Sequence, residues 1–165
     1  GHRSAELIDD FPEVNSVPVT CLYFAAKKSP VSEPVLILNG ESRGIINNLC
    51  VPSAVSPAYA TENSALISVT VLGNPDLDNE VLEELVRENL SEWFGADVRH
   101  WFYLRTYRIQ HALPQVHPPA LTPPQRSIKS ETGLYVCGDH RDMPSIHGAM
   151  VSGRRTAEAV IKDLS

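Results

Sequence analysis

Short apolar runs and alternating apolar positions mark five segments of the chain as β-strands. The predicted strands cover residues 17–26, 35–38, 45–51, 65–72 and 101–113. The segment 65–72 carries apolar side chains on both faces, so we expect it at the centre of a sheet. Asn39-Gly40 marks a turn after the second strand.

Two segments have the periodicity of helices. In residues 78–94 the apolar side chains fall on one stripe at helical spacing: Val81, Leu82, Leu85, Val86, Leu90, Trp93 and Phe94. Asp78 is expected to cap this helix and Gly95 to end it. A second helix is predicted over 146–164, with Ser145 as its cap.

A proline-rich segment divides the chain. Five prolines fall within residues 114–124, a density that excludes helix and central strand and predicts an extended connector. We therefore expect a first part over 1–113, a connector over 114–132, and a strand–loop–helix unit over 133–165. In that last unit, residues 133–139 are predicted to form a short buried strand. The fold class is mixed α/β: a sheet of about five strands with packed helices, plus the final strand–helix unit.

Composition narrows the function classes. An apolar share of 42% supports a hydrophobic core, and a net charge of −6 without a basic run argues against nucleic acid or anionic membrane as partner. No apolar stretch reaches the roughly 20 residues of a membrane span. Cys21, Cys50 and Cys137 are far apart, so we expect reduced thiols in a reducing compartment rather than a disulfide framework. His140 and His147 have no zinc-ligand spacing, and no GxSxG motif indicates a serine hydrolase.

The last unit carries the candidate binding site. Ligands of α/β proteins lie beyond the carboxyl ends of strands, and a helix N-terminus there offers free N–H groups to an anion or a carbonyl. The candidate residues are Gly138, Asp139, Ser145, Ile146, His147, Gly148, Ala149 and Met150. An ordinary strand–helix unit with a tight crossing is the alternative. Tyr103, Arg105 and Tyr107 alternate along the strand 101–113 and could line a substrate pocket from one face, although a partly exposed polar face explains them as well.

The residues 133–139 and 145–161 also resemble the C-terminal signature of flavin-containing amine oxidoreductases, the family of monoamine oxidases, phytoene desaturases and protoporphyrinogen oxidase. The resemblance rests on Gly138-Asp139, Gly148-Ala149, Ser152-Gly153 and the alanines 157 and 159, all at the expected spacing. The upstream part is similar to the substrate domain of plant and cyanobacterial FAD-dependent oxidoreductases. The resemblance implies FAD as cofactor and a terminal strand in a Rossmann-like sheet. It also implies that Asp139 reaches the ribityl–pyrophosphate part of FAD and that the last helix points its N-terminus at the isoalloxazine ring.

One departure from the family is clear. Nothing in the chain matches the phosphate-binding GxGxxG motif, and the glycines at 40 and 44 have the wrong spacing. We therefore expect the C-terminal fragment of a longer flavoprotein that oxidises or desaturates a small organic substrate. Without its N-terminal FAD-binding portion the fragment is expected to be inactive and not to retain FAD. Plastid or cytoplasm is the expected location. The alternative is a non-catalytic scaffold module with a protein partner or a homo-oligomeric state.

Overall fold

The computed structural model describes residues 15–41, 43–115 and 125–165, which fall into two compact units. Pro18–Ala112 form the first, called here the sheet unit. The second, called the C-terminal unit, comprises Leu113–Ser165 together with the residues before Pro18. Most of the predicted proline-rich connector, residues 116–124, lies outside the described residues.

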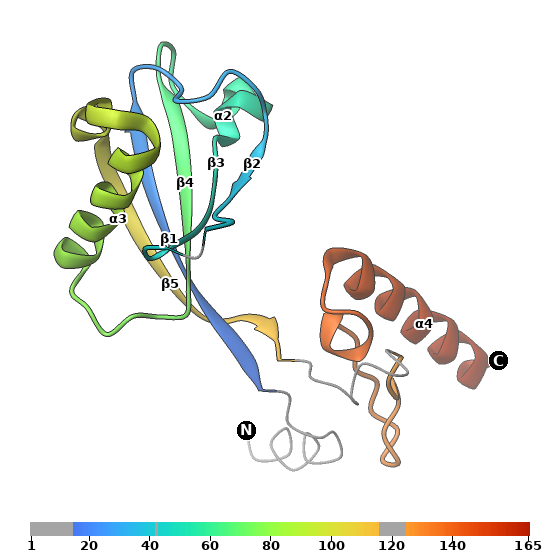
Figure 1. Ribbon diagram of the computed structural model, residues 1–165. Helices are drawn as coiled ribbons and strands as arrows, with labels where there is room; N and C mark the ends of the chain where they lie inside the picture. The colour runs from blue at the N-terminus through green and yellow to red at the C-terminus, as the bar shows by residue number, and fades with distance from the viewer. Residues whose placement is uncertain (1–14, 42, 116–124) are drawn as a thin grey trace. The chain divides into compact units, whose positions relative to one another are not determined.

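The sheet unit contains one five-stranded sheet, with strand order β2-β3-β4-β1-β5 (Figure 1). The strands are β1 (Ser16–Ala26), β2 (Leu36–Leu38), β3 (Ile46–Cys50), β4 (Ala65–Leu72) and β5 (Phe102–Pro114). The pairs β2–β3, β3–β4 and β4–β1 are antiparallel. Two short helical turns, α2 (Pro52–Val55) and η1 (Pro57–Tyr59), connect β3 to β4. All five predicted strands are confirmed, and β4 is central as expected.

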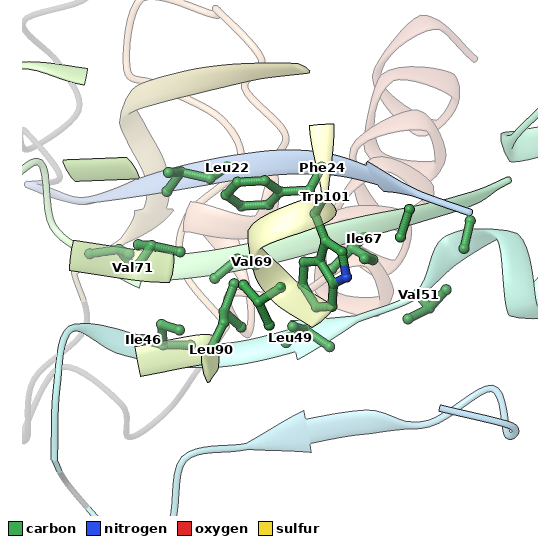
Figure 2. Packing of buried hydrophobic residues seen from close by; sticks show 14 of the residues in the cluster. Leu22, Phe24, Ile46, Leu49, Val51, Ile67, Val69, Val71, Leu90 and Trp101 are labelled. Carbon is green, nitrogen blue, oxygen red and sulfur yellow. The ribbon is translucent and has the colours of Figure 1, made fainter. Parts of the chain in front are cut away.

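One face of the sheet is buried against the helix α3 (Asn79–Phe94). Alternate residues of β1 and β4 supply the strand side of this core, among them Leu22, Phe24, Ile67, Val69 and Val71, all at most 1% exposed. Figure 2 shows these side chains gathered with Leu90 of α3 and with Trp101. The intervening residues of the same strands are half-buried, and no helix of the described part of the sheet unit covers the opposite face of the sheet, here called the open face (Figure 1).

The helix stripe is narrower than the periodicity predicts. Leu82, Val86 and Leu90, spaced four residues apart, are fully buried. Val81 and Leu85 are 45% and 37% exposed, because a helix lying on a flat sheet buries one row of side chains and leaves the flanking rows at the margin. Asp78 is the N-cap residue, as predicted, but its side chain accepts no capping hydrogen bond. Its backbone carbonyl accepts the first hydrogen bond of the helix, from the Leu82 N–H.

Arg87 fixes the chain segment that follows α3. Gly95, with φ +73°, ends the helix as predicted, and the turn η2 (Gly95–His100) leads into Trp101. The Arg87 guanidinium donates to the carbonyls of Val98 at 2.7 Å and Trp101 at 2.8 Å. It also pairs with Glu83 at 2.8 Å and lies 5.0 Å from the centroid of the Phe24 ring. One cation therefore satisfies two carbonyls beside the core.

The C-terminal unit is built around the helix α4 (Ile146–Leu164), preceded by the turn η3 (Asp139–Arg141). The predicted buried strand over 133–139 is wrong: this segment is extended but holds a single bridge, Lys129 to Tyr135, and Cys137 is exposed. A strand needs a neighbour along its length to supply hydrogen-bond partners. Its backbone hydrogen bonds in the described part of this unit go to residues 128–130: the Val136 N–H donates to the Ile128 carbonyl and the Leu134 carbonyl accepts from the Ser130 N–H. No helix among the described residues has the length and apolar character that crossing a membrane requires.

Replacing Arg87 by Met is expected to lower the free energy of unfolding of the sheet unit by about 2 kcal/mol, because two carbonyls beside the core lose their donors. Chemical denaturation followed by tryptophan fluorescence measures the change. Arg99→Met, at an exposed position of η2, is the control and should change stability by less than about 0.5 kcal/mol. Equal stability of the two variants would show that the Arg87 hydrogen bonds contribute nothing.

Candidate functional site

The candidate site begins at a sharp backbone turn. Gly138 has φ +148°, a conformation that side-chain-bearing residues rarely adopt. A Cβ atom there would lie 2.6 Å from the imidazole of His140. The Gly138 N–H donates to Ser152 Oγ at 3.1 Å, which ties the end of the extended segment to α4. The turn therefore places Asp139 directly before the helix.

The two carboxylates of the loop have different surroundings. Asp142 accepts hydrogen bonds from Arg155 at 3.2 Å and from the Met143 N–H at 2.9 Å. The Asp139 carboxylate makes no hydrogen bond within the described part of the chain, and the imidazole Nδ1 of His140 lies 3.9 Å from its Oδ1. Asp142, rather than Asp139, supplies the carboxylate that hydrogen-bonds within the loop and to α4. The Asp139 carboxylate, 35% exposed, is available to a ligand.

The first turn of α4 has two free donors. Ser145 caps the helix as predicted, with its Oγ accepting the Gly148 N–H at 3.0 Å. The N–H groups of Ile146 and His147 have no acceptor among the residues described. Helix N-termini carry partial positive charge, so these amides suit an anion or an electron-rich carbonyl oxygen.

Apolar side chains surround these donors on the surface. Met143, Ile146 and Met150 are 57%, 84% and 70% exposed, and we call them the first-turn patch. Exposed methionine and isoleucine in one turn offer an adaptable apolar surface. The other candidates, His147 and Ala149, are exposed and half-buried, respectively. All eight predicted residues therefore lie in one loop and one helix turn.

Arginine side chains organise the loop from behind. Arg155 donates to the carbonyls of Arg126 at 3.1 Å and Arg141 at 3.4 Å in addition to Asp142. The sequence alone does not indicate this role, because Asp142 and Arg155 are thirteen residues apart and belong to no common motif. Burial, with a contribution from Arg126, lowers the pKa of the Arg141 guanidinium.

Gly148 is required by the loop itself. The residue is buried, and a Cβ atom there would lie 1.9 Å from the Met143 carbonyl oxygen. Gly148 is also one of the predicted binding residues, and that role stays a prediction. The backbone of the loop already demands glycine at this position without any ligand.

Strand alternation predicts that Tyr103, Arg105 and Tyr107 lie on one face of β5. In the structure they do not share one face. The Tyr103 ring packs 5.9 Å from Phe24 at the core, and its hydroxyl donates to Thr106. The Tyr107 ring meets Tyr23 edge-on at 5.8 Å on the open face. Leu104 and Arg105, adjacent in sequence, both line the open face, so the alternation of β5 breaks between Tyr103 and Tyr107.

A hollow of about 460 Å³ lies on the open face of the sheet. Strands β1, β4 and β5 supply its walls: Cys21, Tyr23, Leu66, Leu104, Arg105, Tyr107 and Ile109. Sequence reasoning found Arg105 and Tyr107 but missed Cys21 and Tyr23, although their place on the half-exposed face of β1 follows from strand alternation. Among the described residues, no three His, Cys, Asp or Glu side chains come close enough to hold a metal ion.

Gly148→Ala is expected to destabilise the start of α4 by about 2 kcal/mol, because the new methyl group collides with a backbone carbonyl that cannot turn aside. Hydrogen exchange of the α4 amides, read by mass spectrometry, measures the loss. Gly153→Ala is the matched control: a Cβ atom there meets nothing within 4 Å, so helix propensity should stabilise by up to about 1 kcal/mol. Unchanged exchange in Gly148→Ala would contradict the packing account.

The C-terminal unit should lose stability in mild acid through His140. Burial, reinforced by Arg141, lowers the pKa of this imidazole below its ordinary value of 6.5. The unfolded chain therefore binds a proton at His140 more readily than the folded unit does. The contribution of neutral His140 to the free energy of unfolding is complete above about pH 6.5 and declines as the pH falls below it.

The measurement compares unfolding of the wild type and His140→Gln at pH 7.5 and 5.5. The wild type should lose more stability than the variant over this interval. Parallel losses would show that His140 titrates alike in both states.

Two solved structures resemble the whole of this chain. An oxidoreductase from Methanosarcina mazei matches with a TM-score of 0.67 and 19% identity, over 95% of this chain and 37% of its own. A protein from Pyrococcus furiosus matches with a TM-score of 0.56 and 16% identity, over 96% of this chain and 34% of its own. At such identities the likeness establishes the fold, and the chain spans about a third of the length of each structure. No curated protein matches the chain.

The family assignment comes from the sequence profile of the flavin-containing amine oxidoreductases, which matches residues 2–161. The match covers both units, including the Gly138–Asp139 turn and the first turn of α4. The profile and the mixed α/β fold agree with the resemblance seen in the last 33 residues. The chain belongs to the flavin-containing amine oxidoreductase family.

Proposed function

We propose that this chain is the C-terminal part of an FAD-dependent oxidoreductase of plant or cyanobacterial type, which oxidises or desaturates a small organic substrate. The observation that carries the proposal is the set of unused polar groups before α4. The Asp139 carboxylate and the N–H groups of Ile146 and His147 have no hydrogen-bond partner in the described residues, and the exposed apolar residues of the first-turn patch belong to the same loop and helix turn.

These groups fit the chemistry of FAD. The cofactor combines hydroxyl donors on its ribityl chain with carbonyl acceptors on a flat apolar ring. Asp139 can accept from a hydroxyl, and the amides of Ile146 and His147 can donate to a ring carbonyl. Met143, Ile146 and Met150 supply an apolar surface for the ring.

In this function the flavin, when bound, takes up the electrons that the substrate loses. The chain contributes binding and electrostatics. Asp139 would hold the cofactor in place by accepting a hydrogen bond from one of its ribityl hydroxyls. The positive end of α4 stabilises an electron-rich oxygen placed before it, and the first-turn patch excludes water from the ring. The open-face hollow of the sheet unit, with Tyr23, Arg105 and Tyr107, is assigned to the substrate.

The remaining parts of the proposal concern the longer protein. Structures that match this chain are almost three times as long, which supports a further portion that carries the phosphate-binding GxGxxG loop. The extended segment 133–137, which holds a single isolated bridge among the described residues, would join the Rossmann-like sheet of that portion. A plastid or cytoplasmic location accompanies the proposed plant or cyanobacterial type.

Asp139→Asn in the full-length protein is expected to weaken FAD binding about tenfold, because an amide replaces a charge-assisted acceptor of the ribityl hydroxyl. Titration of the apoprotein with FAD, followed by flavin fluorescence, measures the affinity. Glu158→Gln removes a carboxylate from the exposed surface of α4 and is the control, with unchanged affinity expected. A full-length protein that stays colourless and binds no FAD would overturn the proposal and favour a scaffold module.

A further inference from the structure

We propose that the open-face hollow selects an apolar substrate that carries a carboxylate, and that Arg105 binds this carboxylate. The inference rests on the proposed function, since it names the substrate class of the site assigned there. It departs from the cationic amines that the family name suggests. Three features of the hollow carry it: its apolar walls, its single charge, and the way that charge is held.

The walls of the hollow favour an apolar body. Side chains of Leu66, Leu104 and Ile109 and the rings of Tyr23 and Tyr107 supply most of the surface. A volume of about 460 Å³ is within the range of pockets that hold small organic molecules. The two rings meet edge-on at 5.8 Å with an interplanar angle of 87°, so they form a fixed corner. An aliphatic or aromatic group of the substrate would be buried here.

Among the residues that the structure describes, Arg105 is the one charged residue that lines the hollow. Its guanidinium carbon lies 5.7 Å from the centroid of the Tyr107 ring. It forms no hydrogen bond or ion pair with the described residues, so its N–H donors remain open to a ligand. A guanidinium presents two parallel donors that match the two oxygens of a carboxylate. The Tyr107 ring thus positions a carboxylate receptor at the hollow without neutralising it.

A cationic amine lacks a receptor in the same hollow. No carboxylate of the described part of the chain lines it, so an ammonium group would find no counter-ion there and would be repelled by Arg105. Aromatic faces are the other common receptor for an ammonium ion. The Tyr107 face is occupied by Arg105, and Tyr23 is engaged edge-on with Tyr107. The charge of the hollow therefore discriminates between substrates of equal shape.

The test uses three probes of one shape and different charge: 4-phenylbutyrate, 4-phenylbutanol and 4-phenylbutylamine. Each is titrated at pH 7 and low salt into the complete 165-residue chain, with amide chemical shifts of Cys21, Tyr23, Leu66 and Tyr107 as the readout. The acid should bind about tenfold more tightly than the amine, with the alcohol between them. Added salt should reduce the difference.

Variants assign the preference to Arg105. Because this side chain is exposed, Arg105→Gln should fold normally, and its affinity for the acid should fall to that for the alcohol. Arg105→Lys should keep part of the preference, since the charge remains but the paired donors do not. Arg99→Gln removes an exposed arginine that does not line the hollow and should bind all three probes like the wild type.

The inference is overturned if the amine binds as tightly as the acid, if Arg105→Gln keeps the full preference, or if no probe shifts the residues of the hollow. These outcomes are independent of the cofactor. A full-length protein that binds FAD while its hollow shows no charge preference contradicts the inference alone. A protein that binds no FAD but keeps the preference contradicts the proposed function alone.

Discussion

Burial of a single face of the five-stranded sheet against α3 is the interaction on which the sheet unit depends. Leu82, Val86 and Leu90 of the helix and the alternate residues of β1 and β4 form one continuous core. Because that core contains only every second strand residue, the intervening side chains do not pack in it. The open face can therefore combine tyrosine rings, a thiol and a guanidinium in one hollow without weakening the fold.

The C-terminal unit is held by a different kind of interaction. Arg155 joins Asp142 to the carbonyls of Arg126 and Arg141, and Ser152 binds the Gly138 N–H, so polar contacts fix the loop before α4. The Asp139 carboxylate and the side chains of the first-turn patch take no part in these contacts. Both units thus separate the residues that stabilise them from the residues that a ligand can use.

Local patterns in the sequence predicted most of the fold. The strands, α3 with Gly95, and the Ser145 cap depend on neighbouring residues, and such features are readable from periodicity and capping preferences. The failures depend on distant residues. The prediction of a strand over 133–139 was wrong because this segment has no neighbouring strand along its length. The prediction that Tyr103 and Tyr107 share one face was wrong because the alternation of β5 breaks between them. The Asp142–Arg155 pair and the contribution of Cys21 to the hollow require the tertiary structure.

The collision that forbids a side chain at residue 148 also limits how this region can change in evolution. The obstructing atom is the Met143 carbonyl oxygen, which every amino acid shares. No exchange of the residue at 143 can create room, so a larger residue at 148 has no single compensating substitution there. Genetic suppressors would need to lengthen the loop between 143 and 145. Insertions there would also displace the Ser145 cap, so the glycine and the loop length are expected to be inherited together.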